Sequence, residues 1–440
     1  MTKSTARKIT SFLFAYKVPV LFILLSIGGI LVSGQSLNFI LMELASRFGR
    51  DTFLVLALII PVVSGMGLNF SIVVGAMAAQ IAIFLVMHLL QTVIPTCPSV
   101  LAFLLCVLIS TPIASLFGYL AGKLFNMMKG AEMIGGLILG YFSDGLYQLL
   151  FLFIFGGLIP IANKTLMIAT GIGVKNTIDL SSTKKVNGLK YAIDNIWKVP
   201  LTEFLQLVFA GVVLYAIGAF LYGKIKNRKV LSGRFWILFG ISAILFGVSF
   251  IPAFIQFSMI ISIPVVTYML IAVFCLFIQW FLKTRLGQNM RAVGQNKVVA
   301  NAAGINVDKV RIISIIISTV MAAFGQLIYL QNIGVFTTYG AHKNVALYSI
   351  AALLVGGASV YKATIGQAIL GIILFHILFI VSPLAGQTLM NDAMIGEYFR
   401  VFICYGVIAM SLAMHAWTMK NTKEKKVIEP IALESEVKDN

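Results

Sequence analysis

Charged residues are scarce in this sequence. Only 11% of its 440 residues are Asp, Glu, Lys or Arg, whereas 60% are apolar. A water-soluble domain carries about a quarter charged residues, so this composition excludes an ordinary soluble protein. Runs of 18 or more apolar residues require lipid, and helices satisfy their own backbone groups there. The sequence therefore predicts an all-α polytopic membrane protein with about 8–10 transmembrane helices.

Acidic residues are scarcer still, with 15 against 33 Lys and Arg. The net charge of +18 could suggest nucleic-acid binding, but 22 of the 33 basic residues lie on one predicted membrane face. They fall in 1–17, 123–129, 224–234, 283–311 and the residues after 419. This is the positive-inside pattern, so the charge indicates orientation and attraction to anionic membrane lipid. No nucleic-acid partner is expected.

Motifs of enzymes and metal proteins are also missing. There is no CxxC pair and no HExxH, and four scattered cysteines are interpreted as small core residues: Cys97, Cys106, Cys275 and Cys404. Residues 218–224 match the first part of a phosphate-binding P-loop, but Ile225 follows where Ser or Thr is required. We therefore expect no catalytic residue, metal, cofactor or ATPase site in this chain.

The apolar runs divide the chain into a cytoplasmic N-terminus (1–17), a transmembrane domain (18–418) and a cytoplasmic tail (419–440). The first run resembles a signal peptide, but no small-residue cleavage pattern follows it, so it is predicted to be retained. Residues 157–200 are too polar to span and are predicted to lie outside. Both termini are thus expected in the cytoplasm of a prokaryotic cell.

A parallel internal repeat contains two broken or re-entrant half-helices. After an amphipathic segment assigned to the outer surface, Gln35–Arg50, the short run Thr52–Ser64 ends at the break Gly65–Asn69. The run Asn344–Val355 ends at a second break, Gly356–Lys362. Each follows an outward span and precedes a long return. Matching interruptions point to a translocation pathway, although the glycines could serve only close helix packing.

A basic loop of 29 residues, Lys283–Arg311, separates two apolar spans. Its six Lys and Arg place it on the cytoplasmic side. Asn296 is a suitable N-cap, Lys297–Ala303 contains good helix formers, and Gly304 suits a left-handed residue after the helix. The helix would present an apolar stripe of Val298, Val299, Ala302 and Ala303. The alternative is an ordinary solvated loop.

The segment RAVGQNKVVANAAGINVDKVR within this loop resembles permease subunits of ATP-binding-cassette (ABC) importers of the ribose, nucleoside and branched-chain amino-acid type. The likeness continues to about Trp417 and is patchier before Ile260, where it rests mainly on Gly65–Gly75. In that family the short helix is the coupling helix, which fits a groove on the ATPase subunit. The resemblance implies that coupling involves Arg291, Gly294, Asn296, Val299, Ala302, Ala303 and Gly304.

The same resemblance implies that the glycine-rich breaks line the solute pathway. The candidates in the two breaks are Asn69, Ser71, Ser359, Tyr361 and Thr364. Sugar permeases of the family commonly carry Asp where this chain has Asn69, whereas nucleoside and amino-acid relatives tolerate Asn. The second break is shorter than the family's by a few residues.

Asp144 lies mid-way along an apolar run, where an ionised carboxylate costs a few kcal/mol unless it is paired or wetted. This predicts a pathway or pairing role, with Lys362 as the proposed partner. The alternative is a shifted span in which Asp144 faces a wet crevice. His88 and His376, also in apolar runs, are interpreted as packing residues.

Three function classes remain. The first is an ABC importer permease for a small polar solute, a simple sugar or nucleoside being favoured and a branched-chain amino acid allowed. Its partners would be cytoplasmic ATPases, a second permease (identical or paralogous) and an extracytoplasmic solute-binding protein. The second is an ion-coupled secondary transporter that uses Asp144. The third, an intramembrane enzyme or polymer flippase, lacks a supporting catalytic constellation.

Overall fold

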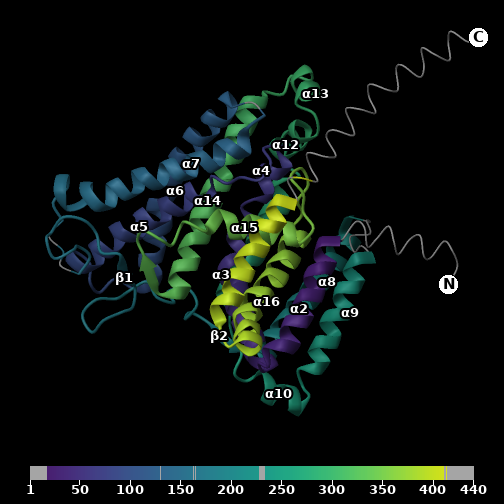
Figure 1. The fold of residues 1–440 in the computed structure, drawn as a ribbon. Helices are drawn as coiled ribbons and strands as arrows, with labels where there is room; N and C mark the ends of the chain where they lie inside the picture. The colour runs from purple at the N-terminus through teal and green to yellow at the C-terminus, as the bar shows by residue number, and fades with distance from the viewer. Residues whose placement is uncertain are drawn as a thin grey trace, which may run out of the picture.

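The computed structural model describes residues 17–410 except 129, 162, 164 and 227–232, together with residue 413. Most of the predicted N-terminal segment, all of the predicted tail and much of the basic turn 224–234 therefore lie outside the described residues. The chain forms a bundle of helices with two small sheets (Figure 1). The helices are α2 Lys17–Ser33, α3 Leu37–Leu56, α4 Ile59–Val63, α5 Ile72–Thr92, α6 Ser99–Met127, α7 Glu132–Leu149, the π-helical η1 Leu150–Leu158, α8 Leu201–Lys226, α9 Gly233–Val248, α10 Pro252–Ser258, α11 Val265–Phe281, α12 Arg285–Gln295, α13 Lys297–Ala302, α14 Val307–Ile333, α15 Val345–Val355 and α16 Ile365–Met390.

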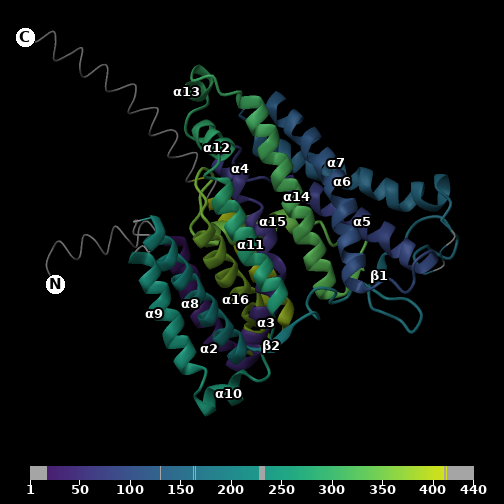
Figure 2. The same ribbon diagram turned by 180° about the vertical axis from the view of Figure 1, so that it is seen from behind.

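The strands are β1 Thr177–Asp179, β2 Lys198–Pro200, β3 Ser262–Pro264 and β4 Val335–Thr337. Among the described residues, seven helices are long and apolar enough to cross a membrane, or up to nine if each of two bent pairs is one span. The last of them is Ala393–Met410. The all-α polytopic membrane fold is confirmed. We call the end of the bundle with α12 and α13 the hairpin end, and the end with β2 and α10 the strand end (Figure 2).

The first break follows a long helical run that begins at the strand end. α3 and α4 follow one another over residues 37–63, about 40 Å of helix at 1.5 Å per residue. The predicted division into a surface helix, Gln35–Arg50, and a half-helix, Thr52–Ser64, is therefore wrong. α3 runs through that boundary without interruption, and its charged residues pair with one another or, at Asp51, with His376 of α16.

The second break follows a true half-helix. β4 ends at the strand end, residues 338–344 continue without regular structure, and α15 begins with Asn344 as its N-cap residue. α15 has 11 residues, about 17 Å, which is too short to cross a ~30 Å hydrocarbon core. The half-helix predicted over Asn344–Val355 is thus present. α16 then returns toward the strand end.

The outward span of each copy of the repeat packs against the return helix of the other copy. α2, the first span of one copy, packs against α16, the return helix of the other. In the same way α14 packs against α5, and also against α6. The helices at the centre are largely buried, 78% for the apolar window of α5, whereas that of α8 is 0% buried and lies at the periphery.

Residues 157–200 connect helices to one another at the strand end. β1 pairs antiparallel with β4, and β2 pairs antiparallel with β3. Asp194, 1% exposed, accepts a hydrogen bond from the Thr267 hydroxyl of α11 at 2.5 Å and one from the Asn332 amide of α14 at 2.7 Å. This segment, which we call the strap, therefore ties α11 to α14.

Candidate coupling and translocation site

The predicted helix in the basic loop is confirmed as α13. The Asn296 side chain caps it, accepting from the backbone N–H groups of Val298 and Val299 at 3.0 and 3.1 Å. Gly304 has φ +81°, the left-handed conformation that ends a helix most readily at glycine. A second helix, α12, precedes it and was not predicted; Thr284 caps it by accepting from the N–H of Gly287 at 3.3 Å. We call α12 and α13 together the hairpin.

The apolar stripe of α13 is exposed. Val298 is 78% and Val299 63% exposed, and Ala302 and Ala303 are exposed beside them. Ala300 on the opposite side is buried against the protein. Two large apolar side chains on a short basic hairpin form a surface suited to docking another protein.

The other helix of the hairpin touches the first break directly. A Cβ on Gly294 would overlap the carbonyl oxygen of Val63, and one on Gly65 would lie 2.8 Å from the Cα of Gly294. Gly65 also has φ +72°, which side chains rarely adopt. Two backbones therefore meet here with no side chain between them, so a displacement of α12 must move the break.

Polar side chains hold the first break against α14. The Asn69 amide donates to the Ser318 hydroxyl at 3.2 Å, and its oxygen accepts from the N–H and hydroxyl of Ser71 at 3.1 and 2.6 Å. The hydroxyls of Ser64 and Ser314 lie 2.7 Å apart. Asn69 and Ser71 are both buried, so in this conformation their hydrogen-bonding groups are used within the protein.

A cluster of three charged side chains joins the hairpin to two spans. The Glu132 carboxylate, at the start of α7, accepts from the guanidinium of Arg311 on α14 and lies 3.1 Å from the Lys297 ammonium on α13. Arg311 is 2% exposed, and its Nε also lies 2.8 Å from the Met66 sulfur of the first break. We call this set the ion cluster.

The second break lies beside the first. Val360 is buried, and a Cβ on Gly67 would lie 3.4 Å from it. Ser359, Tyr361 and Thr364 are exposed, and Thr364 caps α16 by accepting from the N–H of Gln367 at 3.3 Å. The structure thus brings the two breaks together at the hairpin end, with one set of candidates buried and the other exposed.

Asp144 has partners other than the predicted Lys362. Its carboxylate lies 2.7 Å from Nε2 of His342 and accepts from the Gln148 amide at 2.9 Å. His342 is fully buried, and its Nδ1 lies 3.0 Å from the Gln80 side-chain oxygen on α5. The pairing with Lys362 is wrong because residues 338–344 turn back into the bundle and bring His342 to α7. The sequence carries no signal for the contact between His342 and Asp144, since residues 338–344 have no regular structure.

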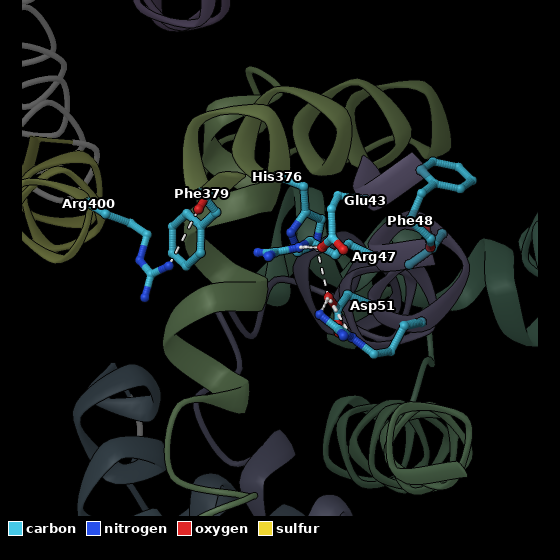
Figure 3. A network of polar contacts seen from close by, with 9 residues as sticks. Glu43, Arg47, Phe48, Asp51, His376, Phe379 and Arg400 are labelled. Carbon is cyan, nitrogen blue, oxygen red and sulfur yellow. Dashed lines mark hydrogen bonds and ion pairs between the residues drawn. The ribbon is translucent and has the colours of Figure 1, made fainter. Parts of the chain in front are cut away.

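A cavity of about 340 Å³ lies between α3, α14, α15 and α16. The charged side chains in and around it include Arg47, Asp51, His376 and Arg400, drawn in Figure 3. The sequence does not predict this site, because the charges of Arg47 and Arg50 are typical of a surface helix and His376, in an apolar run, is typical of a packing residue. The only available signal was the spacing of charges along α3, at residues 43, 47, 50 and 51.

The comparison with protein families identifies the family to which this chain belongs. Residues 40–412 match the family described as a branched-chain amino acid transport system / permease component. The chain belongs to this permease family. A permease component of this kind is not itself an ATPase.

Individual relatives of the permease are distant. It is 25% identical over 245 residues to a guanosine ABC transporter permease protein of Bacillus subtilis, covering 53% of this chain and 69% of the relative. It is 28% identical over 229 residues to a galactose/methyl galactoside import permease protein of Salmonella typhimurium, covering 52% and 61%. A tyrosine transport system permease protein of Clostridioides difficile is 27% identical over 163 residues, covering 36% and 55%. No solved structure matches the permease significantly.

Proposed function

We propose that this chain is a membrane-spanning permease subunit of an ABC importer and forms the pathway for a small polar solute in a prokaryotic cell membrane. The observation that carries the proposal is the contact between the hairpin and the first break at Gly294 and Gly65. It supplies a direct route from a docking surface at one end of the bundle to irregular backbone inside it. Family membership and the importer relatives support the same function.

The partners follow from this function. Cytoplasmic ATPase subunits dock on the exposed stripe of α13, an extracytoplasmic solute-binding protein delivers the solute at the strand end, and a second permease completes the pathway within the lipid. Both termini and the hairpin are cytoplasmic, and the strap is outside. Simple sugars and nucleosides are the favoured solutes because relatives for both are found. Asn69, Ser71, Ser359, Tyr361, Thr364 and Asp144 remain pathway candidates.

The energy for transport comes from the partner ATPases. The partial P-loop match at 218–224 lies inside the membrane helix α8, whereas a P-loop follows a strand. The purified chain is therefore expected to hydrolyse no ATP. The family match gives no support to an ion-driven secondary transporter, in which Asp144 would carry the coupling ion. Uptake should survive an uncoupler while ATP is maintained.

The coupling surface is tested by Ala302→Asp. This places a charge in the middle of the proposed dry contact, where an unpaired buried charge costs several kcal/mol, so ATPase association should fall at least about a hundredfold. Gly304→Val should act differently, because a β-branched residue resists a positive φ and misdirects the end of α13. The matched control for ATPase co-purification is Ala253→Asp, the same change at an exposed alanine of α10 at the opposite end of the bundle. The measurements are co-purification of the ATPases and ATP-driven uptake.

Membrane insertion should be normal in all three variants, because each position lies on an exposed loop or short helix. Normal ATPase recruitment and uptake with Ala302→Asp would show that α13 is not the coupling element.

A further inference from the structure

The cavity between α3, α14, α15 and α16 is placed where a solute would pass. Arg50 and Asp51 lie near the middle of the run 37–63 formed by α3 and α4, and His376 lies 11 residues into α16, about 16 Å from its start. The cavity volume of about 340 Å³ is within the range of small-molecule sites. Asn344 and Tyr348 close it from the half-helix α15, which lies next to the second break.

The charges around the cavity cancel. Asp51 lies 3.2 Å from the Arg50 guanidinium and 3.0 Å from Nε2 of His376. Arg47 donates to Glu43 at 3.2 Å, and Arg400 pairs with Glu397. Three arginines thus meet three carboxylates, and each of these carboxylates already has a cationic partner. Figure 3 shows the part of this network that contains Glu43, Arg47, Asp51 and His376. Among the described residues, Asp51 is the carboxylate that lines the cavity itself, and it is already engaged by Arg50 and His376, so a cationic solute finds no free carboxylate there.

Aromatic rings line the cavity from α14, α15 and α16. Tyr348 meets Phe379 edge-on, with ring centroids 5.1 Å apart, and Phe375 lies 4.1 Å from Phe379, so α15 and α16 present an aromatic wall of three rings. The Arg400 guanidinium lies over the Phe379 ring at 4.4 Å. Tyr329 of α14 also lines the cavity and carries the Arg50 guanidinium over its ring at 5.0 Å. Flat faces of this kind bind flat rings by stacking.

Two polar atoms in this wall have no partner. Nδ1 of His376 and Nε of Arg400 are buried and make no hydrogen bond in the described structure. His376 is 6% exposed, and both residues line the cavity. With Nε2 donating to Asp51, Nδ1 of a neutral His376 is an acceptor, whereas the arginine Nε is a donor. Buried polar groups are costly to leave unpaired, so a ligand that satisfies them is favoured.

We propose that this cavity is an intramembrane binding site for a neutral solute with a flat aromatic ring that carries hydrogen-bonding groups, the chemistry of a nucleoside. The proposal rests on the permease function above and selects one of its favoured solute classes. The ring of the solute stacks on the face of Tyr348, and its polar edge meets His376 and Arg400. The cavity is thus a saturable site within a single permease subunit.

The same observations disfavour other small solutes. A free amino acid brings an ammonium group, and every carboxylate here is already engaged by a cation. A simple sugar has no aromatic ring that could stack on Tyr348. A carboxylate or phosphate solute would have to break an existing Arg–carboxylate pair to be neutralised.

The test is equilibrium binding of radiolabelled guanosine, with galactose and tyrosine as competitors, to the purified full chain in lipid nanodiscs. Tyr348→Leu removes the stacking face and should raise the Kd about tenfold or more, whereas Tyr348→Phe keeps the ring and should bind nearly as the parent does. Arg400→Gln should also weaken binding. The matched controls are Tyr141→Leu on the exposed face of α7 and Lys184→Gln in the strap, which should bind normally.

Saturable guanosine binding that depends on the Tyr348 ring and is not displaced by galactose or tyrosine supports the proposal. Absence of guanosine binding, equal displacement by galactose, or unchanged binding in Tyr348→Leu overturns it. Guanosine binding can fail while the ATPases still co-purify with the parent chain and are lost from the Ala302→Asp variant. In that case the permease function stands and only the solute site is rejected.

Discussion

At the scale of single residues, the hairpin end is held by contacts that leave no room for substitution. The backbone of Gly294 lies against that of Val63 and Gly65, and Arg311 is buried with Glu132 as its carboxylate partner. Steric exclusion governs the first contact and desolvation of charge governs the second. Each therefore predicts a different response to mutation.

Gly294→Ala should uncouple transport. The new Cβ would overlap the Val63 carbonyl, and the backbone shift that relieves it costs about 1–3 kcal/mol. We expect a lower melting temperature and a several-fold lower ATP-driven uptake. Gly366→Ala is the control, because nothing lies within 4 Å of a Cβ there. Parent-like uptake with Gly294→Ala would mean that α12 and the break are not mechanically joined.

Glu132→Gln should destabilise the protein far more than Lys297→Met. Loss of the carboxylate leaves the Arg311 side chain, 3% exposed, as an unpaired buried cation, which costs about 3–5 kcal/mol. The Lys297 side chain is 43% exposed, so water and salt screen its ion pair to at most about 1 kcal/mol. Denaturant unfolding of both variants measures the difference. Equal losses would show that Arg311 has another compensating partner.

At the scale of elements, charge placement explains where the sequence misleads. α3 carries Glu43, Arg47, Arg50 and Asp51, so its composition resembles that of a surface helix although it lies at the centre of the bundle. The strap shows the opposite case. Residues 157–200 are too polar to span, as predicted, yet Asp194 within them is buried between α11 and α14.

Asp194→Ala should loosen the strap. The Thr267 hydroxyl and the Asn332 amide would lose their shared acceptor, and each unsatisfied buried group costs about 1–3 kcal/mol. We expect faster proteolytic cleavage within 181–190 and a lower melting temperature. The control is Glu203→Ala at an exposed position of α8. A cleavage rate equal to that of the parent would contradict a fastening role.

At the scale of the whole molecule, the exchanged packing of α2 with α16 and of α14 with α5 makes one bundle from the two copies. Both breaks consequently meet at the hairpin end, and the strap closes the strand end. If the hairpin end is cytoplasmic, as the positive-inside pattern predicts, the solute enters at the strap and leaves beside the ATPases.

The orientation is tested by thiol labelling. Ser182→Cys in the strap should react with a membrane-impermeant reagent in intact cells, and Asn301→Cys on α13 only after permeabilisation. Background should be low because Cys97, Cys106 and Cys404 are buried and Cys275 is half-buried. Labelling of Ser182→Cys only in permeabilised cells would invert the topology.

The sequence by itself determined the properties that depend on composition and local conformation. Hydropathy sets the membrane class, and the Asn296 cap and Gly304 define α13, because capping and positive φ act within a few residues. Only the tertiary structure decided the partners of the buried charges. His342 and Asp144 are 198 residues apart in the sequence, and Asp51 of α3 pairs with His376 of α16. Such pairs depend on which helices pack together and how deeply each lies, and the cavity exists only where those helices meet.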